Sequence, residues 1–142
     1  MTRDLDIVVA LQESDVNPLV KTLSPDFYVD ADAAKIAVRS ERLFNLLHMQ
    51  SGVKVDLIVR KSSEYRRLEF ERRAAVRVAG VRTWIVSRED LVLSKLVWAR
   101  DAGSELQMRD VRALLDGPVD RDYLRSWAQA LGVTTGLEAA SS

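Results

Sequence analysis

Three aspartates in this sequence of 142 residues lie in apolar segments, where an isolated carboxylate is unfavourable to bury. Asp4 and Asp6 begin the segment "TRDLDIVV", and Asp56 lies in the middle of "VKVDLIV". Side chains two residues apart on a strand share a face, so Asp4 and Asp6 point the same way, with Cα atoms roughly 6.6 Å apart. If the strand of Asp56 is their neighbour, three carboxylates converge.

Three ionised carboxylates in one place repel one another and need a compensating cation. Two unit charges about 4 Å apart repel by about 4 kcal/mol when the effective dielectric constant is about 20. Oxygen ligands without His or Cys suit Mg²⁺ or Mn²⁺, and the sequence contains no Cys. Ions held in this way commonly serve phosphoryl transfer from a nucleoside triphosphate. Asp4, Asp6 and Asp56 are therefore predicted metal ligands.

Each of these acids also has a simpler interpretation. Asp4 and Asp6 could form a solvated strand end near a chain terminus. Asp56 could be a buried acid that pairs with Lys54 or Arg60 and needs no metal. The sequence leaves the metal site and the ion pair open as alternatives.

The segments around the acids predict strands and helices in the same region. The apolar run 5–11 predicts a central strand that is covered on both faces. Helices are expected over 14–23 and 31–42, and a hairpin over 43–59 around Ser51 and Gly52. A charged helix is expected within 62–75, followed by two short strands around Gly80.

From residue 87 onwards the sequence predicts only helices. Ser87 stands three residues before Asp90, as in a capping box, and Gly103 ends the same helix. Two further helices are expected over 104–117 and 120–132, with Ser104 and Asp120 as their N-caps. Residues 136–142 are expected to fray. The prediction is an α+β fold: a sheet core over 1–86 and a helical segment over 87–142, packed as one compact unit.

Composition limits the partners of this chain. Lys plus Arg number 21 and Asp plus Glu number 21, so no overall field attracts nucleic acid and any such contact must be local. The basic cluster "EYRRLEFERRAAVR" could be a local RNA-contacting face, or a solvated helix balanced by its own glutamates. No apolar run approaches the roughly 18 residues that span a bilayer, and we expect a cytoplasmic protein without membrane contact.

Three segments together resemble the minimal nucleotidyltransferase superfamily, specifically the AbiEii-type nucleotidyltransferase-like proteins of toxin–antitoxin systems: "TRDLDIVV", "FNLLHMQSGVKVDLIV" and "WIVSREDLVLSKLVWARDAGSELQMRDVRALL". The resemblance covers nearly the whole chain and implies a mixed sheet flanked by helices. It assigns divalent-metal binding to the DxD pair Asp4 and Asp6 and to the later strand acid Asp56. It adds Lys95, in the "SKL" helix, and Asp110, in the next helix, to the catalytic set.

The resemblance also implies an activity and partners. Members transfer a nucleotide from a nucleoside triphosphate to a hydroxyl acceptor, which in characterised toxin relatives is the acceptor end of transfer RNA. Lys95 would bind the triphosphate, and Asp110 would orient Lys95 or act as general base. An antitoxin protein is a further expected partner. Both residues could instead be ion-paired members of helix faces.

One family feature has no counterpart in this sequence. The family pattern places a helix and a Gly-Ser loop, which holds the triphosphate, before the DxD strand. Here the strand segment follows Met1 almost directly. Two expectations stay open: the native protein begins upstream of Met1, or this is a truncated member with weak or no transferase activity that serves as a binding or regulatory module. A truncated sheet would expose an edge and favour homo-oligomers.

Overall fold

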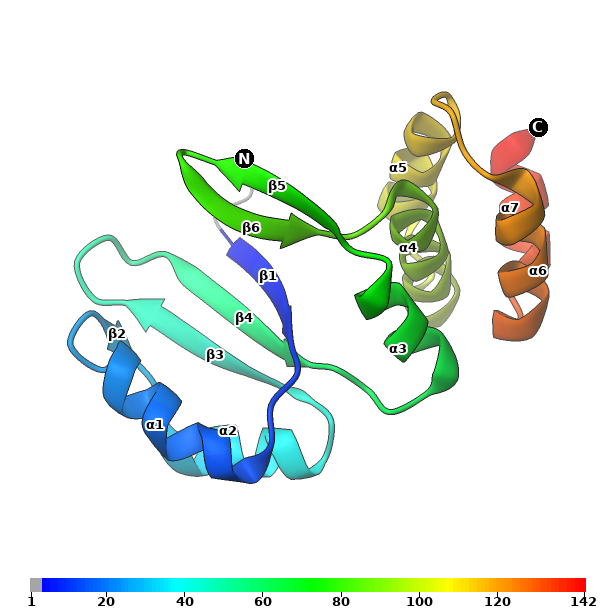
Figure 1. The fold of residues 1–142 in the computed structure, drawn as a ribbon. Helices are drawn as coiled ribbons and strands as arrows, with labels where there is room; N and C mark the ends of the chain where they lie inside the picture. The colour runs from blue at the N-terminus through cyan, green and yellow to red at the C-terminus, as the bar shows by residue number, and fades with distance from the viewer. Residues whose placement is uncertain (1–3) are drawn as a thin grey trace. The chain divides into compact units, whose positions relative to one another are not determined.

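The computed structural model describes residues 4–142 and confirms an α+β fold (Figure 1). The chain divides into two compact units, one ending at Phe70 and the other spanning Glu71–Ser142. The strands around Gly80, which we expected with the sheet core, therefore belong to the second unit.

The first unit is built on a mixed four-stranded sheet. Its elements are β1 (Asp4–Val9), α1 (Glu13–Leu23), β2 (Phe27–Tyr28), α2 (Ala31–Arg39), β3 (Leu43–His48) and β4 (Lys54–Val59), followed by α3 (Glu64–Glu71) at the boundary of the units. The strand order is β1-β4-β3-β2; β1 runs parallel to β4, and the other neighbours are antiparallel. The hairpin predicted over 43–59 is confirmed as β3–β4.

The position of β1 in the sheet differs from the prediction. We expected a central strand covered on both faces, but in the part of the chain that the structure describes β1 is an edge strand that pairs only with β4. Leu5 and Ile7 remain 57% and 45% exposed. The prediction was wrong because the apolar sequence of a strand does not determine how many neighbouring strands it has in the sheet.

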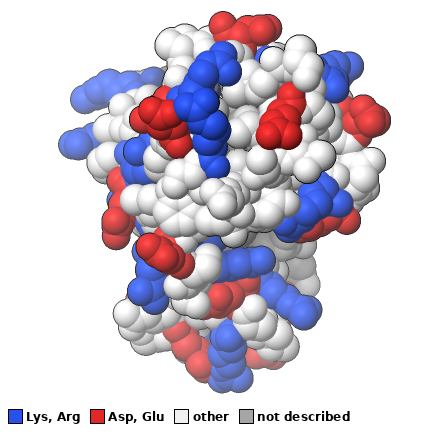
Figure 2. Space-filling model, turned by 90° about the vertical axis from the view of Figure 1, so that its right-hand side faces the viewer, with Lys and Arg blue, Asp and Glu red and all other residues white. Residues whose placement is uncertain are grey.

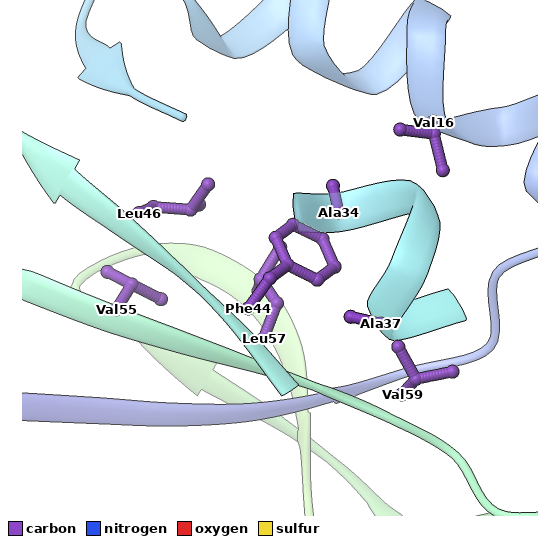
Figure 3. Packing of buried hydrophobic residues seen from close by; sticks show 8 residues of the cluster. All are labelled: Val16, Ala34, Ala37, Phe44, Leu46, Val55, Leu57 and Val59. Atoms are coloured by element: carbon purple, nitrogen blue, oxygen red, sulfur yellow. The ribbon is translucent and has the colours of Figure 1, made fainter. Parts of the chain in front are cut away.

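Helices α1 and α2 cover one face of this sheet and form its core. Figure 3 shows the eight buried side chains, which come from both helices and from β3 and β4: Val16, Ala34, Ala37, Phe44, Leu46, Val55, Leu57 and Val59. The alternate residues of β3 and β4 point to the face that these helices leave uncovered. Asp30 caps α2 by accepting hydrogen bonds from the backbone amides of Asp32 and Ala33.

The second unit contains a hairpin and four helices. The hairpin consists of β5 (Ala74–Val78) and β6 (Val81–Ile85), and the helices are α4 (Arg88–Ala102), α5 (Glu105–Leu115), α6 (Arg121–Leu131) and α7 (Thr134–Ser141). The predicted caps are confirmed, since Ser87, Ser104 and Asp120 each accept a backbone hydrogen bond at the start of a helix. Gly103 and Gly132 end α4 and α6 with φ of +62° and +69°, which favours glycine.

The last residues do not fray as we expected. They form α7, and Leu137 and Ala140 are buried. Helix α7 packs against α5 and α6, and the burial of Leu137 and Ala140 stabilises it. We expected fraying because the segment lies near the end of the sequence, which does not show these contacts.

Adjacent leucines on β3 test which face carries the core. Leu46 is 4% exposed and Leu47 is 44% exposed. We expect Leu46→Ala to lower the free energy of unfolding by about 2–5 kcal/mol, because it opens a cavity under α1 and α2. The matched control Leu47→Ala should lower it by less than about 1 kcal/mol. Urea denaturation followed by circular dichroism measures both, and equal losses would contradict the assignment of faces.

Candidate functional site

The three predicted metal ligands lie on one face of the first sheet. Asp6 and Asp56 are directly paired across the parallel strands β1 and β4. Asp4 lies two residues before Asp6 and pairs with Lys54 in the same register. Alternation along each strand places these side chains on the face opposite α1 and α2. The strand pairing on which the sequence prediction depended is thus confirmed.

Lys54 partly neutralises this acidic face. Its Nζ lies 3.8 Å from Asp4 Oδ2 and 3.5 Å from Asp56 Oδ2. Asn45, opposite Asp56 on β3, donates a hydrogen bond from Nδ2 to Asp56 Oδ1. The Asp56 side chain is only 17% exposed, so these contacts compensate much of its lost hydration. The ion pair with Lys54 is the second interpretation that the sequence left open.

The oxygen donors of this face match the chemistry of a hard divalent cation. Asp4, Asp6 and Asp56 supply carboxylates, and the Asn45 amide supplies a further oxygen if its side chain turns. With the side chains as they stand, residues 4–142 contain no group of three or more His, Cys, Asp or Glu placed to hold a metal ion. A cation would therefore have to displace the Lys54 ammonium from between Asp4 and Asp56.

Lys95 and Asp110 contact each other in the second unit. Lys95 Nζ, on α4, lies 2.8 Å from Asp110 Oδ2 and 2.9 Å from Gln107 Oε1, both on α5. The hydrogen bond from Lys95, and then its positive charge, hold the pKa of Asp110 below its ordinary value. Asp110 is therefore an ionised partner that fixes the Lys95 side chain, as its predicted orienting role requires.

A buried carboxylate that sequence reasoning did not assign to a site lies at the start of α4. Asp90 is fully buried and accepts hydrogen bonds from three side chains: Arg72 Nε at 3.1 Å, Ser87 Oγ at 2.6 Å and Tyr123 Oη at 2.7 Å. The Arg72 guanidinium also lies over the Tyr123 ring, 4.0 Å from its centroid. These contacts tie the start of α4 to α6, so the role of Asp90 is structural.

Of the residues that sequence reasoning did not assign to a site, Asp90 left a signal in the sequence. The Ser87-x-x-Asp90 spacing predicts the cap, although it does not show that Asp90 is buried. Asn45 left no such signal, because counting outward from a two-residue Ser51–Gly52 turn would place Leu47 opposite Asp56, whereas the observed register pairs Asn45 with Asp56. The contact between Arg72 and Tyr123 has no local sequence pattern, because the two residues are far apart in the sequence and meet only in the tertiary structure.

Comparison with known proteins leaves the family open. No protein-family model matches the chain, and no curated protein matches it either.

None of the helices formed by residues 4–142 is long and apolar enough to cross a membrane. On the face drawn in Figure 2, basic and acidic side chains are interspersed, in agreement with a formal charge of zero.

The buried carboxylate gives a test of stability. We expect Asp90→Ala to lower the free energy of unfolding by about 3 kcal/mol, because it removes the buried carboxylate to which Arg72 Nε and the Tyr123 hydroxyl donate. Asp101→Ala, which removes an exposed acid beside Arg100, is the control and should leave stability nearly unchanged. Urea denaturation of both variants is the measurement. A small loss for Asp90→Ala would show that the network is dispensable.

The contact between Lys95 and Asp110 gives a test of pH dependence. The pKa of Asp110 is lower in the folded chain than its ordinary value of 3.8, so the pair stabilises the fold above that pH. The contribution is lost as the pH falls through the folded pKa. We expect Lys95→Gln to raise the Asp110 pKa toward 3.8, as measured by carboxyl-carbon NMR titration. Lys61→Gln is the control, and an unchanged Asp110 pKa in Lys95→Gln would rule out the contact in solution.

Proposed function

We propose that this chain is a divalent-metal-dependent protein of the nucleotidyltransferase type, which transfers a nucleotide from a nucleoside triphosphate to a hydroxyl acceptor. The observation that carries the proposal is the direct pairing of Asp6 with Asp56 on a sheet face that Asp4 shares. Directly opposed like charges on neighbouring strands destabilise a sheet. Such an arrangement is therefore best explained by a ligand of opposite charge.

Charge balance favours a divalent cation as that ligand. Three carboxylates against the single ammonium of Lys54 leave two negative charges on this face. One Mg²⁺ or Mn²⁺ would balance them, and Asp4, Asp6 and Asp56 would hold it. When bound, such an ion supplies positive charge to the phosphoryl oxygens of a triphosphate.

The reaction that follows from this proposal is a displacement at the α-phosphate. The acceptor hydroxyl oxygen forms a bond to the α-phosphorus, and the bond from that phosphorus to the bridging oxygen of the β-phosphate breaks. Pyrophosphate leaves, and the hydroxyl proton passes to a carboxylate or to water. Lys95 stays a predicted phosphate ligand, and Asp110 stays its predicted positioning residue, because the contact between them presents an oriented ammonium.

A second function has an observation in its favour. Lys54 contacts both Asp4 and Asp56, so the acidic face is partly compensated by the chain itself. On this alternative the chain keeps a transferase-type sheet but serves as a binding or regulatory module for a partner, and the acids are ion-paired surface groups.

Substitution of Lys54 distinguishes the two proposed functions experimentally. On the metal proposal its ammonium competes with the cation, so Lys54→Met should bind Mn²⁺ several-fold more tightly than the parent chain. Asp6→Asn should weaken binding at least tenfold, whereas Asp122→Asn, which changes an exposed acid of α6, should bind like the parent. Isothermal titration calorimetry with Mn²⁺, followed by each nucleoside triphosphate, is the measurement. If neither the parent nor Lys54→Met binds Mn²⁺, the metal proposal fails and the binding module remains.

A further inference from the structure

The hairpin β5–β6 of the second unit is labelled in Figure 1. The pairing of its strands places different kinds of side chain on its two faces. One face carries Arg77 and Arg82, which are directly paired, together with Trp84. The other face carries only uncharged, mostly aliphatic residues: Ala74, Val76, Val78, Val81, Thr83 and Ile85. Arg73, just before β5, extends the first face, because its guanidinium lies over the Trp84 ring, 4.8 Å from the centroid. We name Arg73, Arg77, Arg82 and Trp84 the arginine face.

The charge on the arginine face is of one sign. The segment 72–88, both ends included, holds five arginines and no Asp, Glu or Lys. Arg77 and Arg82 are opposed across the strands, an arrangement that destabilises a hairpin. Within residues 4–142, neither Arg77 nor Arg82 forms a salt bridge with an acid, and Arg77 Nη1 donates to the Gly80 carbonyl oxygen at 3.2 Å. The face therefore suits an anionic partner.

Trp84 adds a planar apolar surface to these charges. Its side chain is 50% exposed, and the Arg82 guanidinium also lies near the ring, 5.7 Å from the centroid. An exposed indole bordered by guanidinium groups can stack on a nucleobase while the guanidiniums contact the flanking phosphates. An acidic peptide would satisfy the charges but would offer no repeated planar group for the indole.

We propose that the arginine face binds single-stranded nucleic acid, with a base stacked on Trp84 and backbone phosphates held by Arg73, Arg77 and Arg82. Single strands are favoured over duplexes because stacking on Trp84 needs a base that is free of its neighbours. The chemistry is shared by RNA and DNA, and the experiment distinguishes them. The inference does not rest on the proposed transferase function, because binding is measured without divalent cations or nucleoside triphosphates.

The experiment is fluorescence anisotropy of labelled 12-nucleotide single strands, RNA and DNA of the same sequence, titrated with the full chain. Arg77→Ala/Arg82→Ala should weaken binding at least tenfold and make the salt dependence shallower, by about 0.7 in log–log slope for each lost phosphate contact. Arg109→Ala/Arg112→Ala, which removes two arginines from α5, is the matched control and should bind like the parent. Circular dichroism melting shows whether each variant is folded.

The stacking contact has its own pair of variants. Trp84→Ala should weaken binding about tenfold, whereas Trp84→Phe, which keeps an aromatic ring, should stay within a few-fold of the parent. Whichever of the RNA and DNA strands binds more tightly is identified as the preferred class of nucleic acid. The proposal is overturned if the parent binds neither strand at low salt, if duplex binds as tightly as single strand, or if the Arg109/Arg112 control loses as much affinity as the Arg77/Arg82 variant. Equal losses for Trp84→Ala and Trp84→Phe would overturn the stacking contact.

Discussion

The alternation of side chains along β-strands is the constraint from which both candidate surfaces of this chain follow. In the first unit it sends Phe44, Leu46 and Leu57 toward α1 and α2, and it thereby places Asp56 on the face that these helices leave uncovered. In the second unit the same alternation separates the arginines of β5–β6 from its aliphatic residues. In the first sheet, a shift of one residue in the register would bury the charged groups and expose the apolar ones. The core and the acidic face of that unit are therefore fixed together.

Both surfaces place like charges directly opposite each other, and this is what distinguishes them from the rest of the chain. Asp6 faces Asp56 across β1 and β4, and Arg77 faces Arg82 across β5 and β6. Such pairs oppose folding unless a group of opposite charge compensates them. In the first unit Lys54 provides part of that compensation. The signs of the two surfaces are opposite, so the ligands that we propose for them differ: a cation in one unit and a polyanion in the other.

Asp90 differs from the charged residues of the two candidate surfaces, because its role is structural. Its carboxylate is fully buried, and it has three side-chain donors and a position at the start of α4, where the helix dipole favours a negative group. Burial of a carboxylate is tolerated there because Arg72, Ser87 and Tyr123 donate hydrogen bonds to it. Lys95 and Asp110 lie between these extremes, since their contact is only half-buried and leaves both groups accessible. This partial exposure is compatible with the phosphate-binding role that we propose for Lys95.

The sequence by itself determined the elements with local signals. Strand alternation, the caps at Ser87, Ser104 and Asp120 and the hairpin turns were predictable, because they depend on residues close together in the chain. Alternation also predicted that Asp4 and Asp6 share a face. Only the tertiary structure decided that β1 is an edge strand, that the last residues form a packed helix, and that Arg72 and Tyr123 meet at Asp90. These features depend on contacts between segments far apart in the sequence, and a segment's own composition does not record which neighbours cover it.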